Sequence, residues 1–134
     1  MAHVIVDGHN LIHAWAELAE ILRSSEWLAR EALVDSLERY QDATGENVTV
    51  IFDAPERAQK VDSQTGFRGN VEVVYAPRPG GADAAIERRV FQAADPLEVL
   101  VVSGDRAVLQ YAFGKGARTM DAREFEKMCR ARSR

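Results

Sequence analysis

The sequence predicts an α/β fold in which a mainly parallel sheet of five strands is flanked by helices. Short runs rich in valine and isoleucine recur along the chain, and amphipathic segments with helical periodicity separate them. Continuous apolar runs are typical of buried parallel strands, and their alternation with helices implies right-handed crossover connections. The length of 134 residues suits a single hydrophobic core, so we expect residues 1–134 to form one domain.

The first strand is predicted at residues 4–6, and it leads directly into Asp7, Gly8, His9 and Asn10. Open α/β sheets bind ligands at the C-terminal ends of their strands, so Asp7 is expected at the floor of a crevice. Asn10 can donate or accept a hydrogen bond, or cap the helix that follows. His9 is a candidate for lining the same crevice.

Two helices and a second strand are predicted next. A helical segment runs from residue 11 to about residue 23, and an amphipathic helix covers residues 27–43 after a serine-rich cap. The second strand, residues 47–52, ends on Asp53, so a second apolar strand terminates in a carboxylate. The large apolar side chains expected in the core are Trp15, Trp27, Leu28 and Phe125.

The second half of the chain continues this alternation. Residues 54–70 have no clear periodicity and are predicted as a long loop, a feature that is often functional. Strands are predicted at residues 71–75, 99–102 and 117–120, and helices at residues 82–93, 106–113 and 121–132. The strand at residues 99–102 runs into Ser103, Gly104 and Asp105, so a third strand ends in an acid.

The acids that follow these strands are expected to meet, because the C-terminal ends of parallel strands share one edge of the sheet. Asp83 begins its helix at the same edge, and Glu87 lies one helical turn further on. Two carboxylates ~4 Å apart repel by roughly 4 kcal/mol at an effective dielectric constant of about 20. Either their pKa values rise or a cation neutralises them. Oxygen donors without matching His or Cys residues favour Mg²⁺ or Mn²⁺ over zinc.

Each of these residues also has a purely structural interpretation. A single acid after a strand is usually a turn or helix-capping residue, and Asp83 suits the first turn of any helix. Glu87 either supports the metal ligands or forms a surface pair with Arg88 or another neighbour. Ser103 either contacts a phosphate or a metal-bound water, or caps the next helix. The repetition at three strand ends favours the functional interpretation.

The segment 54–80 is locally basic in an acidic protein. Phe67 and Tyr75 are candidates for stacking on bases, and the whole segment is a candidate grip for single-stranded nucleic acid. The alternative is a solvated loop. The residues expected to bind RNA are Arg57, Lys60, Arg68 and Arg78.

Composition limits the remaining classes. The formal net charge of -4 argues against a nucleic-acid binder that works by bulk positive charge. The single cysteine, Cys129, cannot form an intramolecular disulfide, and no apolar run is long enough to cross a membrane. We therefore expect a cytoplasmic protein without a membrane partner.

Five motifs, taken in order, resemble one family. The chain is similar to the NYN-domain branch of the PIN-like nucleases, in particular to the small bacterial YacP-like proteins, over nearly its whole length. The resemblance implies a PIN-like, Rossmann-like sheet of order 3-2-1-4-5, a divalent-metal site and endoribonuclease activity. The motifs are Val-Asp-Gly-His-Asn-Leu-Ile at 6–12, Tyr-Gln-Asp-Ala-Thr-Gly at 40–45, Val-Ile-Phe-Asp-Ala at 50–54, Ala-Asp-Ala-Ala-Ile-Glu at 82–87 and Val-Ser-Gly-Asp at 102–105.

The resemblance also implies roles for individual residues. The family's catalytic acids match Asp7, Asp53, Asp83 and Asp105, and its companion amide matches Asn10. Asp7 is expected to be the central metal ligand, with Asp83 and Asp105 completing the site directly or through water. Asp53 is expected either to bind metal or to orient a ligand or water.

Two positions depart from the family pattern. His9 stands where a tyrosine is common, which leaves metal ligation intact. Gly104 separates Ser103 from Asp105, a spacing that bears on the reach of Asp105.

These expectations converge on a Mg²⁺- or Mn²⁺-dependent endoribonuclease that acts on single-stranded RNA, with mRNA as the expected substrate. Weak sequence readout by a small basic loop suggests delivery by a ribosome or another RNA–protein particle. One alternative is a catalytically weak RNA-binding or RNA–protein-particle-binding module of the same fold. The other is a Mg²⁺-dependent phosphatase, although such enzymes usually have a second Asp two residues after the nucleophile, where this chain has His9.

Overall fold

The computed structural model describes residues 2–55 and 64–132. These residues contain a six-stranded sheet of order β3-β4-β2-β1-β5-β6. All neighbouring strands are parallel except β3 and β4, which are antiparallel. The strands are β1 (His3–Asp7), β2 (Asn47–Asp53), β3 (Gln64–Arg68), β4 (Val71–Ala76), β5 (Val99–Val102) and β6 (Arg118–Met120).

The five predicted strands are all present in their expected order, but the predicted number of strands is wrong. Residues 64–68 form β3, where the sequence pattern predicts a loop. β3 pairs with β4 across a tight turn at Gly69 and Asn70, with Arg68 opposite Val71. Because β3 is a largely exposed edge strand, it lacks the apolar alternation that reveals a half-buried strand. The Gly-Asn pair was the available hairpin signal.

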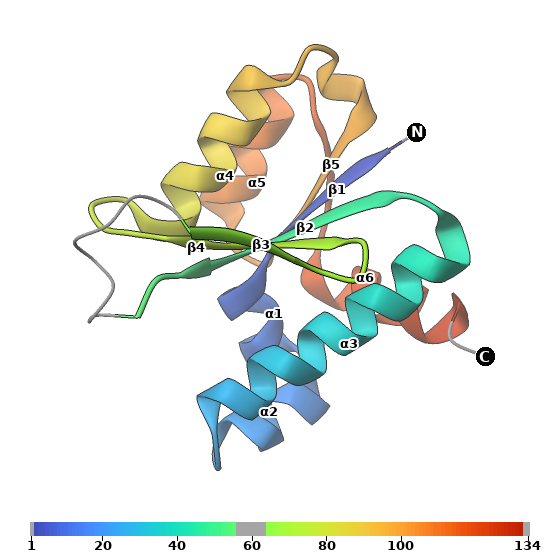
Figure 1. Ribbon diagram of the computed structural model, residues 1–134. Helices are drawn as coiled ribbons and strands as arrows, with labels where there is room; N and C mark the ends of the chain where they lie inside the picture. The colour runs from blue at the N-terminus through green and yellow to red at the C-terminus, as the bar shows by residue number, and fades with distance from the viewer. Residues whose placement is uncertain (1, 56–63, 133–134) are drawn as a thin grey trace.

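Helices lie on both faces of the sheet (Figure 1). One side carries α1 (Gly8–Ala14), α2 (Ala16–Leu22), α3 (Glu26–Thr44) and α6 (Ala122–Arg132). The other side carries α4 (Gly81–Gln92) and α5 (Arg106–Gly114), and the short 3-10 helix η2 (Pro96–Glu98) precedes β5. β1 alternates between the two cores: Val4 and Val6 join the first, and Ile5 joins the second. This two-layered burial explains why the strands are apolar without interruption.

The first helical segment is broken where a continuous helix was predicted. Trp15 separates α1 from α2 with an extended backbone, φ -84° and ψ 119°. Its side chain is buried, and its indole Nε1–H donates a hydrogen bond of 2.8 Å to the carbonyl oxygen of Ala122 at the start of α6. The break between α1 and α2 therefore coincides with the contact between Trp15 and α6, which lies far along the chain.

The predicted core is correct for Trp15 and Phe125 and wrong for Trp27 and Leu28. Trp27 is 61% exposed and Leu28 is 55% exposed. Both lie in the first turn of α3, away from the face that packs on the sheet. That face consists of Ala29, Arg30, Leu33, Val34, Leu37 and Tyr40.

The described part of the chain, residues 2–55 and 64–132, includes no helix with the length and apolar character needed to cross a bilayer.

Candidate functional site

The predicted acids come from strand ends and a helix start that share one edge of the sheet. β1 lies between β2 and β5, and both neighbours run parallel to it, so Asp7, Asp53 and the turn after β5 emerge together. Their charges act on one another: Asp83 and Asp53 both raise the pKa of Asp7. Asp105 raises the pKa of Asp83 in turn. The fold therefore gathers the acidic residues into one electrostatically coupled group.

Asp7 is the buried member of this group, with 6% of its surface exposed. Its Oδ2 accepts a hydrogen bond of 2.9 Å from the Ser103 hydroxyl. Burial is the largest cause that raises the pKa of Asp7 to about 6, and nearby carboxylates add to it. Hydrogen bonds from Ser103 and from the Asn10 backbone N–H oppose this rise. A neighbouring cation or a proton would relieve the cost of this buried negative charge.

Ser103 and Asn10 connect the ends of β1 and β5. The Ser103 hydroxyl, besides donating to Asp7, accepts a hydrogen bond of 3.0 Å from the Asp105 backbone N–H. Oδ1 of Asn10 accepts a hydrogen bond from the Gly104 backbone N–H. A Cβ atom at Gly104 would lie 2.8 Å from Asn10 Oδ1, so the glycine permits this close approach. Gly104 thus serves to anchor the turn that carries Asp105.

Asp53 connects the end of β2 to the start of α4. Its Oδ1 accepts a hydrogen bond of 2.8 Å from the Ala82 backbone N–H. The close approach of Asp53 to the start of α4 requires glycine at position 81, because Gly81 has φ +56° and a Cβ there would lie 2.2 Å from Asp53 Oδ1. Asp53 therefore fixes the turn from which Asp83 projects.

Asp83 lies in the first turn of α4, and Asp105 is the N-cap residue of α5. Partial desolvation, followed by the charges of Asp105, Asp53 and Glu87, raises the pKa of Asp83. Asp105 Oδ1 accepts a hydrogen bond of 2.9 Å from the Ala107 backbone N–H and so caps α5. Asp105 therefore both caps α5 and raises the pKa of Asp83 through its charge. The negative charge of Glu87 raises the pKa of Asp83, so Glu87 belongs electrostatically to the acidic group.

The donor set suits a hard, hydrated cation. In residues 2–55 and 64–132, no group of three or more His, Cys, Asp or Glu side chains lies close enough to hold an ion directly. Mg²⁺ keeps several of its waters in protein sites and takes only one or two carboxylates as direct ligands. The oxygens of Asp7, Asp53, Asp83 and Asp105 are hard donors of this kind. The assignment of Asp7, Asp83 and Asp105 as metal ligands remains a prediction.

The edge itself is open. Asp53 and Asp83 are exposed, and Asp105 is half-buried. Asn10 and Gly104 border a hollow of about 320 Å³ that also touches His13 and Arg123. A larger hollow of about 830 Å³ lies elsewhere, along β6 and α6. The open acidic edge is accessible to an extended polymer.

Arg30 was not predicted as part of this region, although its partner His9 was expected to line the crevice. Arg30 is 9% exposed, and its guanidinium carbon lies 5.2 Å from the ring centre of Phe52 and 5.6 Å from that of Tyr75. Its Nη2 donates to Nε2 of His9 at 3.2 Å and to Oε1 of Glu26 at 3.0 Å. The helical periodicity could have indicated Arg30, because it places this arginine on the buried face of α3, among apolar residues.

The predicted RNA-binding cations have different environments. Arg57 and Lys60 lie outside the described residues. Arg68 forms ion pairs with α3, at 2.9 Å to Glu31, at 3.0 Å to Glu38 and also with Asp35, so carboxylates surround its charge. Arg78 is exposed after β4, at the edge where the acids emerge.

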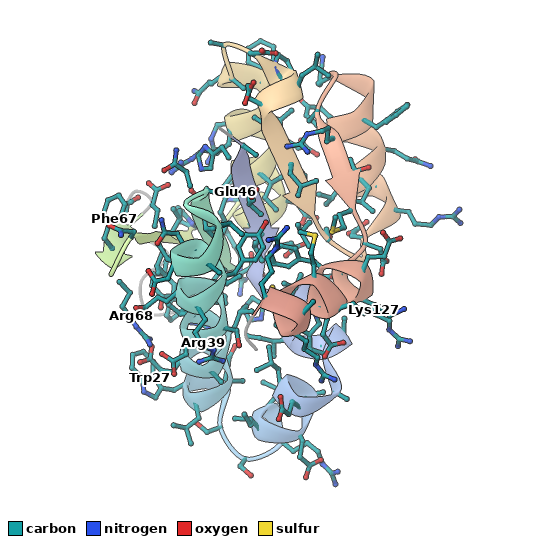
Figure 2. The ribbon with its side chains drawn as sticks, turned by 90° about the vertical axis from the view of Figure 1, so that its right-hand side faces the viewer. Trp27, Arg39, Glu46, Phe67, Arg68 and Lys127 are labelled. Atoms are coloured by element: carbon teal, nitrogen blue, oxygen red, sulfur yellow. The ribbon has the colours of Figure 1, made fainter. Side chains whose placement is uncertain are left out.

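The two aromatic residues predicted to stack on bases also differ. Phe67 is 72% exposed. The Tyr75 ring instead packs against Phe52, with ring centres 5.7 Å apart and planes inclined by 26°. Figure 2 shows Phe67, Arg68 and Trp27 along one side of α3. Phe67 is thus available at the surface, whereas Tyr75 is engaged in packing.

Comparison with known proteins identifies relatives of this chain. The sequence model of the YacP-like NYN domain matches residues 4–134. The protein YacP of Bacillus subtilis strain 168 is 34% identical over 123 residues, which cover 90% of this chain and 71% of YacP.

Two crystal structures of Rae1 (YacP) from Bacillus subtilis have the same fold. One, of a mutant, superposes with a TM-score of 0.82 at 28% identity and covers 98% of this chain and 77% of its own. The other has a TM-score of 0.78 at 29% identity and covers 98% of this chain and 75% of its own. The fold, the ordered motifs and these matches lead to one conclusion: the chain belongs to the YacP-like NYN domain family, which suggests a nuclease-type function related to RNA.

Proposed function

We propose that this protein is a divalent-metal-dependent endoribonuclease that hydrolyses phosphodiester bonds of single-stranded RNA, with mRNA as its substrate. The observation that carries the proposal is the buried Asp7 carboxylate, whose pKa is raised to about 6 at the centre of a coupled acidic group. Such a group is costly without a counter-charge, and a bound cation would supply it. Membership of the YacP-like NYN family supports the same reaction class.

Different residues of this chain would have different roles in the site. Asp7, Asp83 and Asp105 would hold Mg²⁺ or Mn²⁺ through carboxylate oxygens, directly or through water. When bound, the cation supplies Lewis acidity that activates water and neutralises the leaving oxygen. Ser103 orients the Asp7 carboxylate through its 2.9 Å hydrogen bond. Hydrolysis of this kind leaves a 5′-phosphate and a 3′-hydroxyl.

Asn10 and Asp53 would act by holding the acidic group in place. Asn10 binds the backbone of Gly104, one residue before Asp105. Asp53 binds the backbone of Ala82, one residue before Asp83. The backbone just before each of these acids is therefore held by a side chain from another element, Asn10 of α1 or Asp53 of β2, which limits how far the acids can separate.

The open edge and the charge distribution favour a polymer delivered by another particle. Asp53 and Asp83 are exposed, so an extended strand can approach them without entering a closed pocket. The chain has a net charge of -4, and three carboxylates already surround Arg68. A protein with a net negative charge, in which Arg68 is already paired, would hold RNA weakly by charge alone, and a ribosome or similar RNA–protein particle would present its RNA.

The direct test is cleavage of a single-stranded RNA by the wild-type chain with Mn²⁺, with Mg²⁺ and with EDTA. We expect cleavage with either cation, 5′-phosphate ends and no cleavage in EDTA. Asp7→Asn should lower the rate at least ~100-fold, since a metal ligand or catalytic carboxylate is worth several kcal/mol in the transition state. Asp42→Asn, an exposed substitution on α3, is the matched control and should cleave normally.

Three outcomes would contradict the proposal. Cleavage that persists in EDTA and in Asp7→Asn would exclude this mechanism. Binding of RNA by the wild-type protein without cleavage would support the binding-module alternative. Hydrolysis of a small phosphate ester but not of RNA would support the phosphatase alternative.

A further inference from the structure

Asp7 and Arg30 are the buried charged residues among residues 2–55 and 64–132. The proposed function uses Asp7 and leaves Arg30 without a role. Arg30 makes an ion pair with Glu26, whose side chain is 55% exposed, and its buried Nε has no hydrogen-bond partner in the described part of the chain. A buried guanidinium with an unpaired donor lowers stability, so packing alone is a poor reason for an arginine at this position.

The contacts of Arg30 connect it to the acidic edge. Its guanidinium lies over Phe52, the residue before Asp53. Its Nη2 lies 3.2 Å from Nε2 of His9, which is two residues after Asp7. The His9 ring stands edge-on to Phe52, with ring centres 6.0 Å apart and planes at 87°. Arg30, His9 and Phe52 therefore contact one another beside the strand ends that carry Asp7 and Asp53.

The hydrogen bond between Arg30 and His9 determines which ring nitrogen carries the proton. A guanidinium can only donate, so a hydrogen bond at this contact makes Nε2 of His9 the acceptor and leaves the ring proton on Nδ1, although Oε1 of Glu26 also lies 3.7 Å from Nε2. Nδ1 has no hydrogen-bond partner among the residues that the structure describes, and 24% of the His9 side chain is exposed. The positive charge behind Nε2 also strengthens Nδ1–H as a donor.

We propose that His9 is a substrate-binding residue of this site: Arg30 holds its ring with the proton on Nδ1, and that N–H donates to a phosphate oxygen of the RNA backbone. The inference rests on the proposed function, because an RNA strand bound for cleavage must pass this edge. Arg30 is then a positioning residue that acts through His9. An anionic oxygen is the acceptor that fits, since the buried Arg30 charge attracts it.

The first measurement uses the full ¹⁵N-labelled chain without metal or RNA. Long-range ¹H–¹⁵N spectra report which ring nitrogen of each histidine is protonated, and we expect Nδ1–H for His9 in the wild-type protein. Arg30→Met should shift His9 toward a mixture of the two tautomers, while Arg30→Lys, which retains a donor, should preserve part of the preference. Circular dichroism identifies any variant that fails to fold, and the wild-type spectrum alone still tests the tautomer.

The second measurement is binding of fluorescein-labelled single-stranded RNA in EDTA, where no metal-dependent cleavage occurs. His9→Phe keeps the ring and removes the donor, so its dissociation constant should rise about tenfold, equally for poly-U and poly-A. Asp42→Asn, at an exposed position on α3 away from this edge, should bind within about twofold of wild type. In turnover with Mn²⁺, His9→Phe should raise KM and leave kcat nearly unchanged.

The outcomes separate this inference from the proposed function. Protonation of His9 on Nε2, or unchanged RNA binding and KM in His9→Phe, would overturn the inference while RNA cleavage by the wild-type protein stood. A wild-type protein that neither binds nor cleaves RNA would overturn the proposed function, and this inference with it.

Discussion

Replacement of Asp7 by asparagine should stabilise the metal-free protein at neutral pH while removing its activity. Asp7 is 6% exposed, and its pKa is raised from 3.8 to about 6. One pKa unit corresponds to ~1.36 kcal/mol, so ionised Asp7 lowers the free energy of unfolding by about 3 kcal/mol. Asparagine can accept the Ser103 bond but weakens the one from the Asn10 backbone N–H, a loss of about 1 kcal/mol. The net gain at pH 7 is about 2 kcal/mol.

The sign of the pH dependence follows from the raised pKa. Because the folded-state pKa lies above the unfolded value, the folded protein binds more protons between pH 3.8 and about 6. Below this window Asp7 is protonated in both states and does not change the free energy of unfolding. As the pH rises through the window, Asp7 lowers the free energy of unfolding progressively. The stability of Asp7→Asn relative to wild type should therefore grow by about 2 kcal/mol from pH 4 to pH 7, because part of the effect is already present at pH 4.

Urea denaturation in EDTA at a series of pH values measures this difference. Taking the difference between variant and wild type removes the titration of groups that the two proteins share. Asp42→Asn, at an exposed position, should show no such trend. A difference between Asp7→Asn and wild type that stays constant across the window, or that falls as the pH rises, would refute the reasoning.

Three further predictions concern the same edge. Saturating Mg²⁺ should stabilise wild type by about 3 kcal/mol at 100 times its dissociation constant but leave Asp7→Asn nearly unchanged in a thermal melt. Gly81→Ala should cost about 1–3 kcal/mol in urea because of its φ of +56° and the nearby Asp53 oxygen, whereas Gly66→Ala, with nothing within 4 Å, serves as the control. Ser103→Ala should cost about 1–3 kcal/mol and move the acidic limb of the pH–activity profile to higher pH, because the Ser103 hydrogen bond lowers the pKa of Asp7.

Local patterns in the sequence were enough to place most of the architecture. A buried parallel strand is apolar throughout, so β1, β2 and β5 are visible in isolation, and the acids that follow them necessarily share an edge. β3 was not predicted because an exposed edge strand needs no apolar alternation. Trp27 and Leu28 were misplaced because apolar character does not say which side of α3 meets the sheet.

The sequence by itself determined the fold class, the strand order expected from the family resemblance, and the meeting of the strand-end acids. The tertiary structure alone decided which side chains pair. Ser103 and Asp7 are 96 residues apart in sequence, Asn10 and Gly104 are 94 apart, and Arg30 and His9 are 21 apart. The physical reason is that periodicity and strand termination are local properties, whereas a hydrogen bond across the sheet edge depends on how separate elements pack.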